Sequence, residues 1–561
     1  MSRRSRKLDQ LRTGCSELEN HYIDEFVSGR LSRREFVQRG TVLGMSTSLL
    51  GAVVAACGGK TKTSHATTSA ATGPKPKRGG TLRLALLAPG SKIDPLTSDD
   101  TGIVMLTQVG EYLLFDSNLL HRLVPMLATS WSHNGDATVW TFKLRPGVRF
   151  NNGAPMTADD VVWTFQQLSN PKLPSNALST FQGVLSPSGV VKIDSHTVAF
   201  HLDSANGNFP YLVSSDNYNA IIVPKGTDYS SWQSTFVGTG AFKLTSYQQN
   251  VGASFARNPY WWGGQPYLDG THFLFYANAP AQVLALQGGD VDVIVQFAAV
   301  SGEALFNNPA YTIVHYTSSV HRELSLRCDV PPFDDPRVRK AVAYSLDRPA
   351  LVSALLKGYG VVGNDTPFAP IFPSSCPNVP QRKQNLALGR QLMREAGHPA
   401  GVTAPFYTEI NQEIPLLAQA IKSDAAKVGV NFKLVIESQD AYYGKSTFGN
   451  SDWLDGTASL VDYGARGVPN VYLSAALTSH GPWNAAHFHN PTYDKLVRDY
   501  IAAPDLQSQR SVACKIERLL LDETPIIIPY WLDGLTASTA RVHGLNPTAI
   551  PQIYLDRAYI D

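Results

Sequence analysis

The chain has 561 residues, of which 43% are hydrophobic and 17% charged, so its composition supplies large packed cores and is not that of a disordered protein. Because a single core rarely grows beyond about 250 to 300 residues, this length predicts at least two lobes. The formal net charge is +2, but residues 1–78 carry 14 basic and 6 acidic residues, which leaves −6 on residues 79–561. An acidic body of this kind argues against nucleic acid as a partner.

The N-terminal region carries the features of an export signal. Residues 41–56 are apolar and uncharged, but 16 residues are fewer than the roughly 20 needed to span a bilayer, so they predict a signal segment. Arg33 and Arg34, just before it, resemble a twin-arginine export signal. Cys57, just after it in the stretch VAACG, resembles the lipidation site of bacterial lipoproteins. That resemblance implies cleavage before Cys57 and a diacyl anchor on its thiol, which would be durable.

Two further segments flank this signal. Apolar residues recur at spacings of three and four between Leu8 and Phe26, which predicts a short amphipathic helix that is removed with the signal. Residues 58–78 are rich in Thr, Ser, Ala, Gly, Lys and Pro, and predict a flexible tether with a reach on the order of 25 Å. We therefore expect an exported body, anchored by lipid to the outer face of the cytoplasmic membrane.

Three cysteines follow the lipidation site, namely Cys328, Cys376 and Cys514, so at most one intramolecular disulfide can form. Proximity in the sequence favours a bond between Cys328 and Cys376. The alternative is three free, buried thiols.

Strand-like and helix-like patterns alternate along the rest of the chain, which predicts a mixed α/β protein. Residues 140–145 alternate strictly between apolar and polar, and Pro146-Gly147 would turn the chain back into residues 148–150, forming a half-buried hairpin. Thr157 is placed to cap a helix that reaches Leu168, with two aspartates in its first turn.

A second helix is predicted from Asp335-Pro336 to Leu346. The stretch GYGVVG at residues 358–363 matches the dinucleotide-binding pattern, but it follows a helical run rather than a strand and therefore predicts a helix-ending loop. His487 and His489 would share one face of an extended segment, but no third ligand has a suitable spacing. We therefore expect neither a metal site nor a cofactor.

Seven segments, taken in chain order, resemble the peptide/nickel class (family 5) of extracellular solute-binding proteins from ATP-binding-cassette importers. They are GGTL, PMLATSW, WTFKLRPGVRFNNGAPMTADDVVWTF, GTGAFKL with ARNPYWWGGQPYLD, LQGGDVDV, PPFDDPRVRKAVAYSLDR, and HNPTYDKLV with DETPIIIPYW. The resemblance implies a two-lobed, periplasmic-binding-protein-like α/β fold of type II, of the large class with an extra subdomain, and a hinge between the lobes.

The resemblance also implies the division of the chain. Lobe 1 would comprise residues 79–115, 228–316 and 525–561, with residues 116–227 as its extra subdomain, and lobe 2 would comprise residues 317–524. The chain would cross between the lobes near residues 316–321 and 525–530, where small dihedral changes permit closure.

Asp462 and Tyr463 resemble the pair of peptide-binding relatives in which the aspartate receives the ligand's α-ammonium group. A solvated loop aspartate is the alternative. The loop that follows is longer than in those relatives and contains Arg466, which would either pair with Asp462 or offer its guanidinium to a ligand carboxylate. Trp453 and Tyr463 are expected to supply apolar walls to the site.

These features predict a monomeric receptor, not an enzyme, that binds a small peptide-like ligand in the cleft and delivers it to the permease subunits of an importer. Binding would stabilise the closed form of the two lobes. The alternatives are an extracellular hydrolase of peptides or glycans and a lipoprotein that presents ligand to a signalling partner. The hydrolase would need a nucleophile and base, or a metal set, for which the sequence offers no suitable spacing.

Overall fold

The computed structural model describes residues 76–90, 92–98, 101–117, 122–550 and 552–561, together with Ile23 and Phe26, both helical. The chain divides into two units, Met1–Lys75 with Ser117–Arg122, and Pro76–Asp116 with Leu123–Asp561. The export signal, Cys57 and most of the tether lie outside the described residues. Within the described part, no helix is long and apolar enough to cross a membrane.

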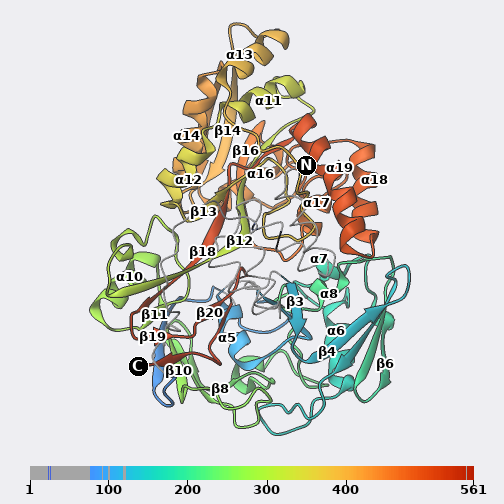
Figure 1. Ribbon diagram of the computed structural model, residues 1–561, viewed down its shortest axis with the longest axis vertical. Helices are drawn as coiled ribbons and strands as arrows, with labels where there is room; N and C mark the ends of the chain where they lie inside the picture. Colours follow the sequence, from blue (N-terminus) through green and yellow to red (C-terminus); the bar gives the residue numbers. More distant parts are fainter. Residues whose placement is uncertain are drawn as a thin grey trace, which may run out of the picture. The chain divides into compact units, whose positions relative to one another are not determined.

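A mixed β-sheet forms the frame of the second unit (Figure 1). In the described residues it has 12 strands, of which β13 (Gly360–Val362) pairs with β18 and β17 (Ile526–Ile527) pairs with β12. The other strands lie in the order β15 (Val430–Glu437), β14 (Val402–Glu409), β16 (Ala458–Tyr463), β12 (Tyr311–Leu326), β18 (Tyr530–Thr539), β11 (Val293–Ile294), β1 (Thr81–Leu87), β10 (Gly270–Tyr276), β9 (Gly252–Arg257) and β8 (Phe242–Gln248).

The 16-residue strand β12 links the two halves of this sheet. Its first half, from Tyr311 to Thr317, pairs antiparallel with β18, and its second half pairs antiparallel with β16. The register with β18 shifts between Thr317 and His321. On one side β14 runs parallel to both β15 and β16, and on the other β1 runs parallel to both β10 and β11. One long strand therefore joins two groups of parallel strands.

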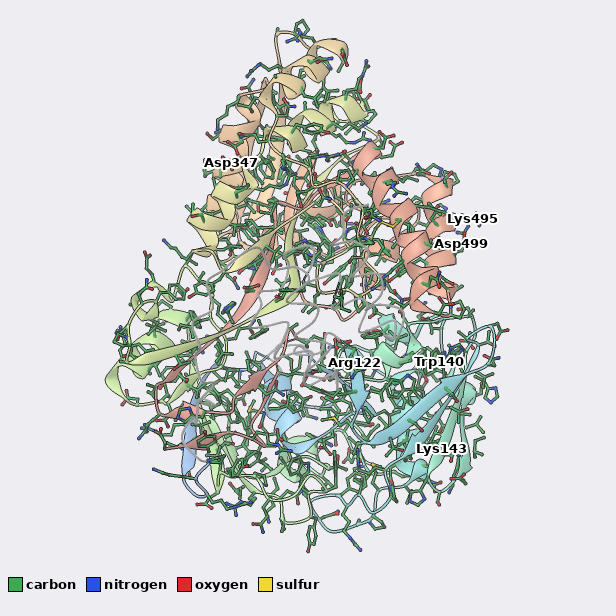
Figure 2. The ribbon with its side chains drawn as sticks, in the orientation of Figure 1. Arg122, Trp140, Lys143, Asp347, Lys495 and Asp499 are labelled. Carbon is green, nitrogen blue, oxygen red and sulfur yellow. A yellow bond between two sulfur atoms is a disulfide. The ribbon has the colours of Figure 1, made fainter. Side chains whose placement is uncertain are left out.

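A separate antiparallel sheet contains β4 (Ala128–His133), β5 (Val139–Leu144), β7 (Thr197–His201) and β6 (Val190–Asp194), in that order. The predicted alternation in β5 is confirmed, because Trp140 is buried and Lys143 is exposed (Figure 2). The predicted hairpin is wrong. Both edges of β5 are occupied by β4 and β7, and residues 148–150 fold back on residues 154–156 instead.

The predicted helix starts are confirmed. Helix α6 (Ala158–Leu168) begins with a capping box in which Thr157 and Asp160 satisfy each other's backbone N–H groups. Helix α11 (Pro336–Ser345) is capped by Asp335, with proline in its first turn. Helix α12 (Arg348–Leu356) ends where Lys357 adopts a left-handed conformation, and the GYGVVG stretch leads into β13. The stretch therefore follows the end of a helix, as predicted, but it is not wholly a loop, because Gly360–Val362 form β13.

The remaining helices cover the sheets. They include α5 (Gly102–Val109), α10 (Ala279–Gly288), α13 (Leu386–Glu395), α14 (Ile414–Ala426), α15 (Gln439–Tyr443), α16 (Asp452–Asp455), α17 (Asn470–Ser474), α18 (Pro491–Ala502) and α19 (Leu506–Glu523). The short strands β2 (Leu114–Ser117) and β3 (Arg122–Pro125) form a two-stranded ribbon after α5.

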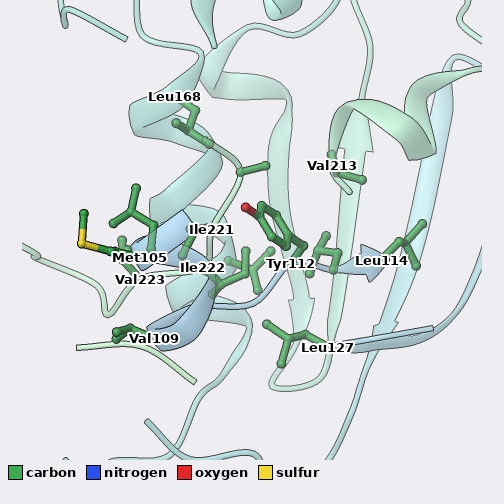
Figure 3. Packing of buried hydrophobic residues seen from close by; sticks show 14 of the residues in the cluster. Met105, Val109, Tyr112, Leu114, Leu127, Leu168, Val213, Ile221, Ile222 and Val223 are labelled. Atoms are coloured by element: carbon green, nitrogen blue, oxygen red, sulfur yellow. The ribbon is translucent and has the colours of Figure 1, made fainter. Parts of the chain in front are cut away.

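Apolar clusters fill both faces of the main sheet. Around α5, Met105 and Val109 pack with Tyr112 and with the buried run of residues 220–223 (Figure 3). Farther along, Leu460 of β16 contributes to the cluster under α14, whereas its neighbour Val461 contributes to the cluster under α18 and α19. Successive residues of β16 therefore point to opposite faces, as pleating requires.

The predicted Cys328–Cys376 pair is wrong, because Cys376 is bonded to Cys514 of α19. The loop that carries Cys376 is held against the same face of α19 by Glu517, which accepts the backbone N–H of Cys376 at 2.7 Å. Cys328 follows the end of β12, where its backbone N–H donates to Ala486, and its thiol is free. Proximity in the sequence therefore did not predict proximity in the fold.

Candidate ligand-binding site

Asp462 lies on β16 and pairs across the sheet with Arg322 of β12. The Nη1 atom of Arg322 is 3.5 Å from Oδ2 of Asp462, and the Asp462 side chain is 32% exposed while that of Arg322 is 1% exposed. The alternative of a solvated loop aspartate is therefore wrong. The sheet holds Asp462 in place, and enough of its carboxylate is accessible to meet a ligand.

The principal partner of Arg322 is Glu413, which accepts two hydrogen bonds from the guanidinium, at 2.8 Å from Nε and 3.2 Å from Nη2. Tyr530 donates its hydroxyl to the same carboxylate at 3.1 Å. Burial lowers the pKa of Arg322, but the charges of Glu413 and Asp462 outweigh burial and raise its pKa above the ordinary value. The guanidinium is therefore held as a fixed positive charge beside Asp462.

A third carboxylate, Glu409 at the end of β14, lies fully buried beside Asp462. Gln439 donates to it at 2.6 Å, and the hydroxyl of Tyr443 lies 2.8 Å from Glu409 and 3.3 Å from Asp462. Burial, followed by the charge of Asp462, raises the pKa of Glu409. Arg322 thus faces Glu413 and Asp462, and Glu409 adjoins Asp462 through Tyr443, so that carboxyl groups outnumber the one guanidinium. This arrangement favours the approach of a positively charged group to Asp462.

Aromatic rings gather around the end of β16. Trp453 of α16 lies against Tyr443 and Trp483, with ring centroids 5.5 and 6.4 Å apart, and Tyr463 lies 6.4 Å from Trp483. Trp453 and Tyr463 are nearly buried, whereas Tyr443 and Trp483 are partly exposed. The accessible aromatic surface here therefore comes mainly from Tyr443 and Trp483, and a role of Trp453 and Tyr463 as walls of the site stays a prediction.

Tyr463 and Asp462 face opposite sides of β16. Tyr463 stacks on His321 at 5.3 Å, one position before Arg322 on β12, while Asp462 faces Arg322. The two residues predicted together as a ligand-binding pair are therefore separated by the plane of the sheet. A ligand held by Asp462 would reach Tyr463 only around the end of the strand.

Arg466 does not pair with Asp462, because Arg322 takes that position. Its Nη1 donates to the carbonyl of Ala465 at 2.8 Å, and its backbone N–H and C=O both bond to the hydroxyl of Ser319. The Arg466 loop adjoins Asp216, and a side chain at Gly467 would collide with that carboxylate.

A small pocket of about 80 Å³ lies between this loop and residues 176–219. Burial and the neighbouring Asp116 raise the pKa of Asp216, and the charge of Arg466 opposes them. The positive charge of Arg466 therefore balances an acidic pair, which reduces what it can offer to a ligand carboxylate.

The two histidines considered as metal ligands form no metal centre with their neighbours. His487 makes contacts with the carbonyl of Leu454 at 3.0 Å and with Asp329 at 3.4 Å. In the part of the chain that the structure describes, no group of three or more His, Cys, Asp or Glu side chains is arranged to hold a metal ion.

Sequence reasoning missed Arg322, Glu409 and Glu413. For Arg322 the available signal was the run His321-Arg322-Glu323, three consecutive ionisable residues between the apolar residues Val320 and Leu324. Such residues are almost never buried unless they are paired, so the run indicated partners elsewhere in the fold.

Comparison with known proteins gives consistent matches over most of the chain. The sequence model described as "Bacterial extracellular solute-binding proteins, family 5 Middle" matches residues 122–478. Heme-binding protein A of Haemophilus influenzae is 25% identical over 75% of this chain and 81% of its own. Probable di/tripeptide-binding protein 5 of Pseudomonas aeruginosa is 25% identical over 76% and 85%. The structure of the substrate-binding protein CtaP of Listeria monocytogenes superposes with a TM-score of 0.76 at 21% identity, covering 86% of this chain and 100% of CtaP.

Proposed function

The chain belongs to family 5 of the bacterial extracellular solute-binding proteins, and we propose that it is the lipid-anchored receptor of an ATP-binding-cassette importer, with a peptide-like amine as its ligand. Its fold is the two-lobed α/β fold of this family, and it is a binding protein rather than an enzyme.

The partly exposed carboxylate of Asp462 is the observation that carries the choice of ligand. It stands at the accessible edge of a cluster in which three carboxyl groups outnumber one guanidinium. A ligand ammonium placed there would make charge-assisted hydrogen bonds, each worth about 1.5 to 3 kcal/mol. Relatives named as di- and tripeptide-binding proteins support a peptide, since a peptide carries such an ammonium group at its N terminus.

We propose that lobe 1 comprises residues 79–115, 228–316 and 525–561, with residues 116–227 as its extra subdomain, and that lobe 2 comprises residues 317–524. The register shift in β12 between Thr317 and His321 supports a hinge there, because a strand bends most easily where its ladder is interrupted. Ligand would bridge the two lobes, and the importer's permease would recognise the closed, monomeric receptor.

The anchor is proposed from the sequence. Twin arginines at Arg33 and Arg34, an apolar segment and Cys57 occur in the order expected of an exported lipoprotein. A diacyl group on Cys57 would keep the receptor at the outer face of the cytoplasmic membrane.

A matched pair of ligands tests the proposal. Di- and tripeptides are screened by thermal shift, and each peptide that binds is then compared by isothermal titration calorimetry with its N-acetylated form. We expect acetylation to weaken binding by roughly tenfold or more, because it removes the charge that Asp462 would meet. Equal affinities for the two forms, or no stabilisation by any peptide of the screen, would contradict a peptide-ammonium ligand.

A further inference from the structure

A second cavity lies away from Asp462 and Arg466. It has a volume of about 230 Å³, and its wall residues fall within 107–115, 125–126, 241–263, 546 and 554–557. These stretches include the end of α5, the β2–β3 ribbon, the loop after β9 and the C-terminal segment. The cavity therefore belongs to the part of the fold built around β1, and no lining residue comes from the region of the candidate peptide site.

Aromatic rings make much of the wall. Trp261 and Trp262 are consecutive, with ring centroids 6.0 Å apart, and Phe115 packs edge-on against Tyr554 at 4.9 Å. Gly263 makes this arrangement possible, because a side chain there would collide with the indole of Trp261. Four rings around one small space form a surface suited to cations, which are attracted to the electron-rich faces of aromatic rings.

A nearly buried carboxylate lies in the same wall. Glu111 is 3% exposed, and its two oxygens accept the indole N–H groups of Trp261 at 2.9 Å and Trp262 at 2.8 Å. Burial raises the pKa of Glu111 to about 7, against the lowering effect of the two indoles. The hydroxyl of Thr239 is a third side-chain donor to Glu111. Each carboxylate oxygen has two acceptor positions, so three donors leave one position unused.

The indole and Gln108 N–H donors near Glu111 are already engaged. Both indoles donate to Glu111, and the side-chain amide of Gln108 donates to the carbonyls of Val104 at 3.0 Å and Ile553 at 2.7 Å. Asp556 adds a second carboxylate, which Arg557 approaches to 3.5 Å from the exposed rim. Burial raises the pKa of Asp556, and Arg557 opposes this. The wall therefore presents the carboxyl groups of Glu111 and Asp556 to a guest, and the guanidinium of Arg557, also a wall residue, lies beside Asp556 at the exposed rim.

One cation already uses the same aromatic surface. The guanidinium of Arg145 lies 4.0 Å from the ring centroid of Trp262, and its Nε donates to the carbonyl of Met126, another wall residue. Trp262 therefore already binds one cation, and it offers a guest only the part of its ring that Arg145 leaves open. A cavity of about 150 Å³ accommodates benzene, so this one has room for a somewhat larger guest.

We propose that this cavity is a second ligand site that takes a small organic ammonium ion of about the size of choline. The aromatic rings surround its methyl groups, and Glu111 and Asp556 supply the countercharge. The cavity and the candidate peptide site at Asp462 have no residue in common, so the ammonium ion would bind independently of the peptide-like ligand.

The test compares choline with 3,3-dimethylbutan-1-ol, which has the same branched skeleton with carbon in place of the charged nitrogen. Binding to the purified full chain is measured by calorimetry and by quenching of tryptophan fluorescence. We expect choline to bind at least tenfold more tightly than the alcohol. Equal affinities, or no response to choline at about 10 mM, would overturn the proposal.

Substitutions in the cavity test whether choline binds there. Asp556→Asn is expected to weaken choline binding at least threefold, and it should fold, because Asp556 lies beside an exposed arginine. Trp261→Phe provides a second variant, with circular dichroism as the check on folding. Asp462→Asn is the matched control and should leave choline affinity unchanged. Choline binding that Asp462→Asn abolishes, or that both cavity variants leave intact, would place the ion elsewhere and refute the assignment.

Discussion

Replacing Asp462 by asparagine should weaken the binding of a peptide with a free N terminus by about 12- to 140-fold. Asparagine keeps the size and one acceptor oxygen but removes the charge, so the loss corresponds to a charge-assisted hydrogen bond of about 1.5 to 3 kcal/mol. The fold should tolerate the change, since Arg322 keeps its 2.8 Å bond to Glu413. The free energy of unfolding should therefore change much less than the binding energy.

The assay is calorimetric titration of both proteins with one peptide and with its N-acetylated form. Acetylation of the peptide should weaken its binding to the unmodified protein by about as much as the substitution does. The Asp462→Asn variant should bind the free and the acetylated peptide with nearly equal affinity. Asp499→Asn is the matched control, because Asp499 pairs with Lys495 on the exposed face of α18, distant in sequence and role from β16 (Figure 2). If the variant and the unmodified protein bind the free peptide equally, or if acetylation costs both the same, Asp462 does not receive the ammonium group.

Three further outcomes are expected. Asp365→Asn should lower the free energy of unfolding by about 3 to 5 kcal/mol in urea titrations, because it leaves the buried guanidinium groups of Arg348 and Arg382 without their shared carboxylate; a loss below about 1 kcal/mol would contradict this. Burial raises the pKa of Glu517 to about 7, so its contribution to stability is full below about pH 4.5 and is lost as the pH rises through about 7. Stability should therefore fall more between about pH 5 and pH 8 in the unmodified protein than in Glu517→Gln, and parallel curves would refute that cause. Cys57→Ser should move the exported protein from the membrane fraction to the soluble fraction on immunoblots, and retention in the membrane would exclude the lipid anchor.

Local chemistry predicted the helix starts well. Thr157 and Asp335 cap α6 and α11 because the groups they satisfy lie within three residues along the chain. The strand β5 was predicted from its own alternation, but its partners were not, because pairing depends on which other strands compete for its two edges. The disulfide prediction was wrong for the same reason. Cys376 and Cys514 are 138 positions apart, and only the packing of the loop on α19 brings them together.

In the candidate site, too, the local feature was predicted and its distant partners were not. Asp462 was predicted from a short motif, whereas the residues that set its charge environment come from β12, β14 and the start of α14. No local pattern couples Arg322 to Glu413, which follows it by 91 positions. The sequence thus pointed to Asp462 as a candidate, and the fold was needed to show that Asp462 and Glu413 share one guanidinium and that Glu409 lies beside them.

The unequal distances around Arg322 have a consequence for ligand binding. The guanidinium of Arg322 donates to Glu413 at 2.8 Å, whereas it lies 3.5 Å from Asp462, so Glu413 is its stronger partner. An arriving ammonium group would therefore share Asp462 with Arg322 rather than displace it, and no buried charge would lose its partner. Unpairing a buried charge costs several kcal/mol. This arrangement would therefore let the proposed ligand bind and leave without disturbing β12, which pairs with strands on both sides of the sheet.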